Sequence, residues 1–303
     1  MSAGRRRLAS ALSVLALALG LMALVPLLAS ASRSFLYYQD GAWIDRVALT
    51  PKHRPVHVID TKSGPLAIAV AGSHVFWTDE SDDAAGFGSS IMEADADGRH
   101  VRTLVSGLPI TISLAAAHGY VYWPDEDGIG RVAVDGTHQD RSYIPLPPEN
   151  GGGVADGLAI TGSHLFFSRC QDGTVGRVDL DGHSIRQNLV SLGWPNCPQA
   201  LATDGGRVYW AELGEAGESY GRIGSATRGG GDIEEASLVI NSEDGPFGIA
   251  AGGGSMFWAW GGATGSPEYV ARSQIHGLKV NSKFVTGGSA IALMVGSRRG
   301  GTG

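Results

Sequence analysis

Residues 121–136 read VYWPDEDGIGRVAVDG, and the rest of the chain repeats the pattern of this stretch. It joins an aromatic, strand-like phrase, VYWPD, to a second strand-like segment that begins at Ile129 and reaches the pair Asp135-Gly136. An Asp-Gly pair between alternating apolar runs is a strong signal for a tight antiparallel turn, because glycine accepts a positive φ. The stretch therefore predicts consecutive antiparallel strands.

The aromatic phrase occurs six times along the chain. The six copies are LYYQD from Leu36, VFWTD from Val75, VYWPD from Val121, LFFSR from Leu165, VYWAE from Val208 and MFWAW from Met256. The second aromatic residue of each copy, here called the anchor, is Tyr38, Trp77, Trp123, Phe167, Trp210 or Trp258, at spacings of 39, 46, 44, 43 and 48 residues. A period in the low forties with four strands per unit is typical of propeller blades.

A second repeated phrase predicts how the ring of blades closes. An alanine that follows Ile or Leu stands eight residues before five of the anchors, at Ala69, Ala115, Ala159, Ala202 and Ala250. We interpret it as the mark of an inner strand, where crowding at the axis leaves room only for a methyl group. Residues 289–294 repeat this phrase without a following aromatic strand. The sequence therefore predicts an all-β, six-bladed β-propeller over residues 35–296, closed by the C-terminal strand pairing into the N-terminal blade, with a flexible tail at 297–303.

The phrases VFWTD, VYWPD and VYWAE resemble the YWTD repeats of low-density lipoprotein receptor propellers. In that family the aromatic residue packs between blades and the aspartate ties neighbouring blades together, so the resemblance implies this structural role for Asp40, Asp79 and Asp125. Glu212 replaces the aspartate in the fifth copy, and the fourth and sixth copies also depart from the pattern. Blades four to six are therefore expected to be held together differently.

The composition excludes several classes of protein. The chain has 303 residues, of which 43% are apolar and 17% are charged, so it is neither a disordered polyampholyte nor a coiled coil. Its formal net charge of −7 offers no basic face to a nucleic acid. Most of its 46 glycines are expected in the turns of the repeat.

The N-terminal residues 1–31 have the layout of an export signal. Arg5, Arg6 and Arg7 precede an apolar run, and Ala29-Ser30-Ala31 provides a small-residue cleavage site. The segment is predicted to be a signal peptide cleaved after Ala31; the alternative is an uncleaved membrane anchor through residues 8–30, because the run is long enough to span a bilayer. In both cases the protein is expected outside the cytoplasm, either secreted or membrane-anchored.

The two cysteines are expected to form a disulfide. Cys170 follows the aromatic strand of blade four and Cys197 leads into the inner strand of blade five, so both are predicted on one face of the propeller. Two cysteines in an oxidising compartment are expected to form a bridge rather than a redox or metal site.

The same face, called the top face here, consists of the loops that follow each aromatic strand and the segments that enter each inner strand. Its loop acids include Asp79, Glu80, Asp125, Glu126, Asp127 and Glu212. Hard oxygen ligands suit calcium, so a cation at Asp125, Asp127 or Asp156 is one interpretation. The other is that these are ordinary solvated acids and blade-tying aspartates, with no cofactor.

The mouth of the central channel is predicted from the position two residues before each inner-strand Ile or Leu. This rule selects Leu66, Ile112, Asp156, Gln199, Phe247 and Ser289. A metal-dependent lactonase would need several carboxylate or amide ligands there, and the sequence supplies too few. A small ligand-binding pocket remains as a hypothesis, with candidate residues on the top face: Asp156, Trp194, Asn196, Gln199, Glu212, Trp260 and Ser289.

The sequence contains no nucleophile–histidine–acid set and no HExxH motif, so no catalytic residues are predicted. The favoured interpretation is a non-catalytic propeller that binds a protein, a peptide or a cell-wall carbohydrate on its top face. The alternative is a propeller enzyme, a lyase or lactonase-like hydrolase, with a cation at the channel mouth.

Overall fold

A computed structural model describes residues 34–81, 88–146, 155–212, 221–240, 246–260, 268–275, 279–288 and 291–294. The predicted export signal and C-terminal tail, as well as Ser289, lie outside these residues. Residues Arg33–Gly296 form one compact unit. Within the described segments, no helix has the length and apolarity needed to cross a membrane.

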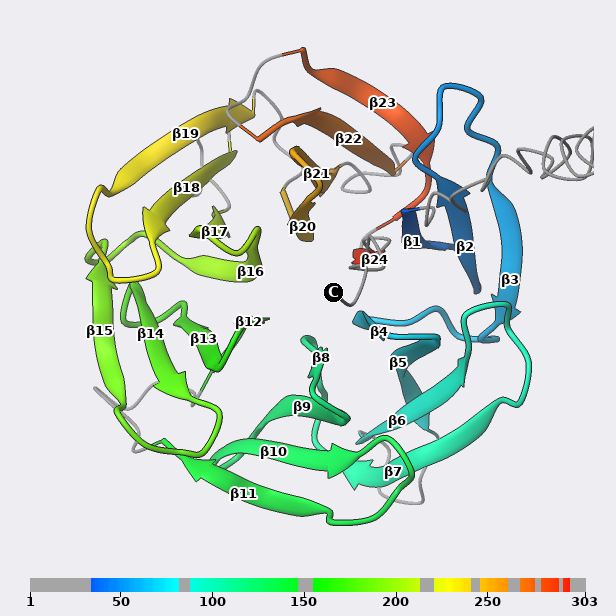
Figure 1. Cartoon of the computed structure of the whole chain (residues 1–303), viewed down its shortest axis with the longest axis horizontal. Helices are drawn as coiled ribbons and strands as arrows, with labels where there is room; N and C mark the ends of the chain where they lie inside the picture. Colours follow the sequence, from blue (N-terminus) through cyan, green and yellow to red (C-terminus); the bar gives the residue numbers. More distant parts are fainter. Residues whose placement is uncertain are drawn as a thin grey trace, which may run out of the picture. The chain divides into compact units, whose positions relative to one another are not determined.

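The unit consists of six four-stranded antiparallel sheets, the blades, arranged in a ring (Figure 1). The strands of the first three blades, from the inside outward, are β24 (Ile291–Met294), β1 (Phe35–Asp40), β2 (Trp43–Ala48) and β3 (Val56–Asp60) in blade one; β4 (Ile68–Ala71), β5 (His74–Ser81), β6 (Gly88–Asp95) and β7 (Arg102–Leu108) in blade two; and β8 (Ala115–Ala117), β9 (Tyr120–Asp125), β10 (Gly128–Ala133) and β11 (Asp140–Pro145) in blade three.

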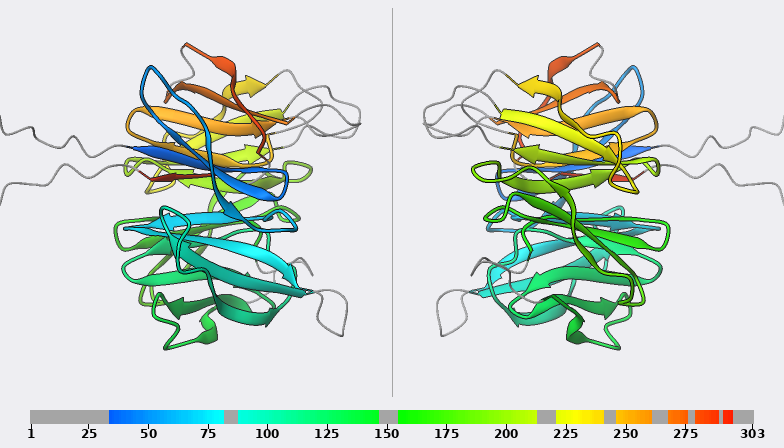
Figure 2. Two further views of the ribbon diagram at one scale, coloured as in Figure 1. Left: turned by 90° about the vertical axis from the view of Figure 1, so that its right-hand side faces the viewer. Right: turned by 90° about the vertical axis from the view of Figure 1, so that its left-hand side faces the viewer.

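The other three blades follow the same order. Their strands are β12 (Leu158–Thr161), β13 (His164–Arg169), β14 (Thr174–Asp179) and β15 (Arg186–Ser191) in blade four; β16 (Pro198–Thr203), β17 (Arg207–Glu212), β18 (Gly221–Thr227) and β19 (Glu234–Ile240) in blade five; and β20 (Ile249–Gly252), β21 (Ser255–Trp260), β22 (Tyr269–Gln274) and β23 (Asn281–Thr286) in blade six. In side view the strands run between two faces, the top face and the opposite bottom face (Figure 2).

The predicted closure of the ring is confirmed. The C-terminal β24 pairs antiparallel with β1, with Ile291 opposite Tyr38 and Ala292 opposite Tyr37. Blade one is thereby completed by both ends of the propeller, and the first and last blades present no open sheet edge to each other.

The anchor aromatics fill the space between blades. All six are buried, with at most 3% of their surface exposed. The inner-strand alanines Ala69, Ala115, Ala159, Ala202 and Ala250 are buried as well. Apolar clusters join each blade to the next, as Trp123 of blade three packs in the cluster that contains Phe76 of blade two. The hydrophobic core therefore lies between the blades and continues around the ring.

A glycine lies opposite the anchor in blades three, four and five, where Gly130 pairs with Trp123, Gly176 with Phe167 and Gly224 with Trp210. The anchor ring lies directly against this glycine. A β-carbon at Gly130 would be 2.5 Å from Cε2 of Trp123, far inside van der Waals contact. The I-G-R and V-G-R phrases of the repeat are thus explained by the close approach of the ring to the next strand.

Candidate ligand-binding surface on the top face

Four of the six predicted channel-mouth residues line one cavity of about 320 Å³ on the top face. Leu66, Ile112, Gln199 and Phe247 surround it, together with the inner-strand residues Leu158 and Ile291. Leu66 and Ile112 are exposed, at 38% and 52%. The cavity therefore has a mainly apolar rim, with Gln199 as one of its few polar side chains.

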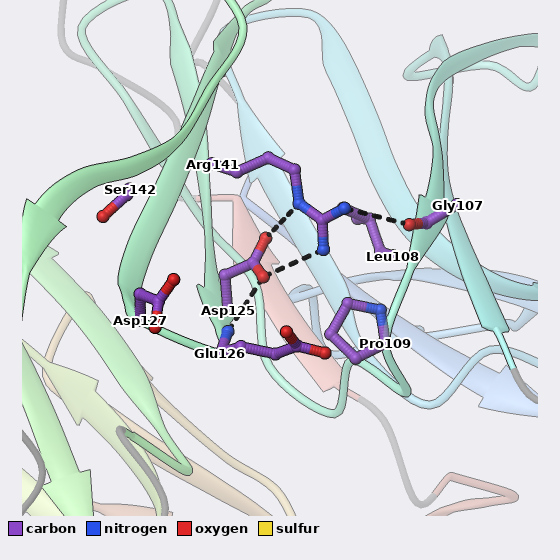
Figure 3. Close-up of a pocket in the computed structure, with 8 residues that line it drawn as sticks. All are labelled: Gly107, Leu108, Pro109, Asp125, Glu126, Asp127, Arg141 and Ser142. Atoms are coloured by element: carbon purple, nitrogen blue, oxygen red, sulfur yellow. Dashed lines mark hydrogen bonds and ion pairs between the residues drawn. The ribbon is translucent and has the colours of Figure 1, made fainter.

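A second cavity, of about 530 Å³, lies between blades two and three (Figure 3). It is lined by the end of β7 and the residue after it, by the end of β9 and the turn after it, and by β11: Gly107, Leu108, Pro109, Asp125, Glu126, Asp127, Arg141 and Ser142. We call it the Asp125 pocket. Its exposed acids are Glu126 and Asp127, because Asp125 is buried.

Asp125, in the wall of this pocket, accepts hydrogen bonds from Trp123, from Arg141 and from the backbone N–H of Glu126. Its carboxylate accepts a hydrogen bond from Trp123 Nε1 at 2.9 Å and two from Arg141, from Nε and Nη2 at 3.0 Å each. Arg141 also donates to the carbonyl oxygen of Gly107 in blade two (Figure 3). Burial acts to raise the pKa of Asp125, but the hydrogen bonds from Arg141, Trp123 and the Glu126 amide hold it below its usual value. Asp125 is therefore ionised and contacts the neighbouring blade through Arg141.

One chain segment connects the two cavities. Leu108 and Pro109 line the Asp125 pocket, while Ile112, Ser113 and Leu114 line the channel-mouth cavity. Ile110, between them, is 54% exposed. The top face thus presents an apolar cavity and an acidic pocket joined by exposed isoleucines.

Blade five repeats the arrangement around Asp125 with Glu212. The carboxylate of Glu212, 1% exposed, accepts hydrogen bonds from Trp210 Nε1 at 2.5 Å and from Arg222 Nε at 2.9 Å. Arg222 also binds Asn196. Glu212 and Asn196 were candidates for ligand binding, but the structure gives both of them partners within the protein.

In blade four, the last residue of the aromatic phrase is a positively charged arginine, where blades three and five have the acids Asp125 and Glu212. Arg169 replaces the acid, is 1% exposed, and donates to Gln187 Oε1 at 3.0 Å. Its guanidinium lies 3.9 Å from Asp172. The arginine of LFFSR is thus buried together with two partners, Gln187 on β15 and Asp172 on the loop that follows β13.

Asp156 does not line the channel-mouth cavity. Its carboxylate accepts the backbone N–H of Cys170 at 2.7 Å. The pKa of Asp156 is raised, mainly by burial and also by the negative charge of Asp172. The hydrogen bond from the Cys170 amide acts in the opposite direction. The carboxylate therefore lies within blade four, beside the disulfide, rather than at the mouth.

Replacing Asp156 with asparagine is expected to stabilise the protein at neutral pH. A carboxyl group whose pKa is raised by folding favours the folded state below its unfolded pKa of 3.8, and this contribution is lost as the pH rises through the folded-state value. Asparagine retains an acceptor for the Cys170 amide without the charge. Thermal melts of both proteins from pH 4 to 8 should show an advantage for Asp156→Asn that shrinks with acidification; a constant or opposite difference would contradict the assignment.

Trp194, Trp260 and Asp79 do not line the channel-mouth cavity. Trp194 is 83% exposed. Trp260 donates its indole N–H to the carbonyl oxygen of Ser282 at 2.7 Å and lies 5.3 Å from the ring of Tyr269. Asp79 accepts a hydrogen bond from Ser63 Oγ at 2.7 Å, on the segment that enters blade two. Of the candidate binding residues that the structure describes, only Gln199 therefore lines the channel-mouth cavity, and a pocket formed by the full set stays a prediction.

Ligand atoms of Asp40, Asp45 and His57 lie within 4.8 Å of one another, the one such group among the described residues. Asp45 faces Tyr38, where other blades have glycine, alanine or methionine. Two carboxylates and an imidazole suit a divalent transition metal. The repeat pattern did not reveal this group, because Asp45 and His57 depart from it. Calcium at Asp125, Asp127 or Asp156 stays a prediction.

The predicted disulfide is present. Cys170 and Cys197 are bonded, with their Cα atoms 4.0 Å apart. Cys170 directly follows β13 and Cys197 directly precedes β16, so the bridge joins the top-face ends of blades four and five.

Comparison with known proteins supports the fold. No protein-family model matches the chain, and no curated protein matches it in sequence. The solved structure of a nidogen/laminin complex contains a chain that is similar at a TM-score of 0.60 and 17% identity, over 86% of this chain and 98% of that one. A chain of the hydrazine synthase of Kuenenia stuttgartiensis is similar at a TM-score of 0.51 and 13% identity, over 70% of this chain and 63% of that one. The resemblance to YWTD propellers thus holds at the level of the fold.

Proposed function

We propose that this protein is an extracytoplasmic, non-catalytic propeller that binds a protein partner through its top face. The observation that carries the proposal is the apolar channel-mouth cavity joined to the acidic Asp125 pocket by exposed Ile110 and Ile112. Exposed apolar surface beside concave pockets is typical of interaction sites on a rigid scaffold.

The chemistry of the surface defines the partner. An apolar side chain fits the channel-mouth cavity, where Leu66, Ile112 and Phe247 would remove it from water. A lysine or arginine close to it would face Glu126 and Asp127, which are exposed and which form no ion pair with another described residue. The net charge of −7 favours the approach of such a basic segment. We therefore propose a protein segment that carries an apolar residue next to a basic one.

Two further observations support a protein partner and a location outside the cytoplasm. The similar nidogen/laminin structure contains a complex of two proteins, although the likeness itself concerns the fold. A disulfide persists in oxidising compartments, which agrees with the predicted export signal. Secretion and membrane anchoring are the two forms that the proposal allows.

The test is selection of peptides from a random display library on the full chain. We expect enriched peptides that pair an apolar residue with lysine or arginine, and we expect Ile112→Asp to weaken their binding at least tenfold. Removing one buried apolar anchor costs roughly 1.5–3 kcal/mol, and about 1.4 kcal/mol corresponds to a tenfold change. Val101→Asp is the matched control, because Val101 is also 52% exposed but lies next to β7, outside both cavities.

Three outcomes would overturn the proposal. The enriched peptides could bind both variants equally, or they could lack basic residues. Alternatively, a glycan array could show binding that Ile112→Asp abolishes while no peptide binds, which would assign the top face to carbohydrate.

A further inference from the structure

A third cavity, of about 520 Å³, lies on the bottom face at the seam between blades six and one, away from the surface of the proposed function. The β2–β3 connection contributes His53 to it, and blade six contributes Ser255, Arg272, Lys279, Asn281 and Phe284. Three of these side chains are basic, and none of the described residues that line the cavity is acidic. In a protein with a net charge of −7, this concentration of basic groups requires an explanation.

Four other seams on the bottom face share one contact. A side chain of one blade donates a hydrogen bond to a carbonyl oxygen just past the third strand of the next blade. The contacts are Arg46 to Ala96, Arg102 to Val134, Tyr143 to Leu180 and Arg177 to Arg228, at 2.5–2.9 Å. We call this contact the seam clamp. It satisfies a carbonyl group of the outer hairpin and fixes one blade against the next.

Arg272 has the strand position of a clamp residue but makes no clamp. It is the fourth residue of β22, as Arg46 is of β2 and Arg177 of β14. Arg131 of β10 has this position as well, but it packs over Tyr120 and Tyr143, and Tyr143 makes the clamp of that blade. Its Nη2 donates instead to Ser255 Oγ of its own blade, at 3.1 Å. In the part of the chain that the structure describes, no protein acceptor binds its other N–H groups.

Aromatic rings hold Arg272 in place at the cavity wall. Its guanidinium carbon lies 5.5 Å from the ring centroids of both Phe257 and Phe284. The ring of His53 stacks on Phe284 from the blade-one side, at 4.5 Å. Arg272 and His53 are therefore oriented by the same phenylalanine, and exposed Lys279 adds a second full positive charge.

We propose that this cavity binds a phosphate monoester. The planar fork of an arginine binds phosphate oxygens through two parallel N–H bonds, and a lysine adds a compact charge. The cavity exceeds the size of a phosphate ion and falls in the usual range for small-molecule sites, so the group that carries the phosphate fits as well. The serine hydroxyl and asparagine amide of the wall offer further polar contacts.

The test is isothermal titration calorimetry of the full chain with glycerol 1-phosphate, with glycerol and inorganic phosphate as separate ligands. We expect glycerol 1-phosphate to bind, inorganic phosphate to bind more weakly, and glycerol not to bind. Arg272→Met and Lys279→Glu should each weaken the binding of glycerol 1-phosphate at least tenfold. Lys279 is exposed, so its substitution leaves the fold intact and tests the site even if Arg272→Met unfolds.

Two matched controls separate the site from general charge effects. Arg177→Met removes the arginine at the same position of blade four, where it is used as a clamp, and Lys62→Glu makes the same charge change at an exposed residue elsewhere. Both should bind glycerol 1-phosphate like the unaltered protein. The proposal is overturned if millimolar glycerol 1-phosphate gives no heat of binding, if both site variants bind normally, or if the controls lose as much affinity as the site variants.

Discussion

Replacing Gly130 with alanine is expected to lower the free energy of unfolding by about 3 kcal/mol, at the upper end of the range for overpacking a close-packed interior. The added β-carbon would lie 2.5 Å from Cε2, 2.6 Å from Cζ2 and 2.8 Å from Nε1 of Trp123. Trp123 is fully buried, so its ring can move away only by displacing its packed neighbours. For a domain of this size, the melting temperature should fall by roughly 6–12 °C.

The same substitution should also disturb the top face. A displaced Trp123 ring moves the Nε1 that donates to Asp125, and Asp125 fixes Arg141 in the wall of the Asp125 pocket. Peptides selected on the unaltered protein should therefore bind Gly130→Ala more weakly, even at a temperature where it is folded. The effect of a core glycine thus extends to the binding surface through the hydrogen bonds that Asp125 accepts from Trp123 and Arg141.

Gly229→Ala is the matched control for this prediction. Gly229 lies in the turn between β18 and β19, and a β-carbon there meets no atom within 4 Å. Its substitution should leave the melting temperature unchanged or slightly raised, because alanine restricts the unfolded chain. Equal melting temperatures for Gly130→Ala and the unaltered protein would contradict the packing described here.

The parts of the fold that depend on strand periodicity could be predicted from the sequence. The recurring aromatic phrase located all six anchors, and the unpaired Ile-Ala phrase near the C-terminus predicted that β24 completes blade one. These features follow from the spacing of residues along strands, because side chains alternate between the faces of a sheet. Backbone position alone was also enough to place Leu66, Ile112, Gln199 and Phe247 around the channel mouth.

The polar contacts could not be predicted in the same way. Asp156 follows the same positional rule as Gln199, yet its carboxylate bonds to the Cys170 amide. Glu212 and Asn196 were expected to be available to a ligand, but Arg222 contacts both. The orientation of a polar side chain depends on which donor the next strand or blade brings within reach, and the repeat pattern does not contain that information.

The contacts between blades on the bottom face also show that the repeat pattern does not predict the partner of a polar side chain. Arg46, Arg131, Arg177 and Arg272 occupy one position of the repeat, but only Arg46 and Arg177 bind a carbonyl group of the next blade. Arg131 packs over the rings of Tyr120 and Tyr143. Arg272 binds Ser255 and packs beside two phenylalanines instead. The four arginines are equivalent in sequence, so their different roles appear only once the partner blade is in place.

Removal of the disulfide is the second prediction with a large expected effect. The bridge closes a loop over a sequence separation of 27 residues. In the chain-entropy model, a cross-link of this length stabilises the folded state by about 3–4 kcal/mol, because it restricts the unfolded chain. The double variant Cys170→Ala/Cys197→Ala should therefore melt roughly 6–16 °C below the unaltered protein.

Reduction provides the control within the same protein. Dithiothreitol should lower the melting temperature of the unaltered protein to that of the double variant, and it should leave the double variant unchanged. Alkylation of the denatured protein should add two labels after reduction and none before it, as read from the intact mass. Two labels without reduction would show that the cysteines are free. Equal melting temperatures of the bridged and double-variant proteins would instead show that the bridge does not stabilise the junction of blades four and five.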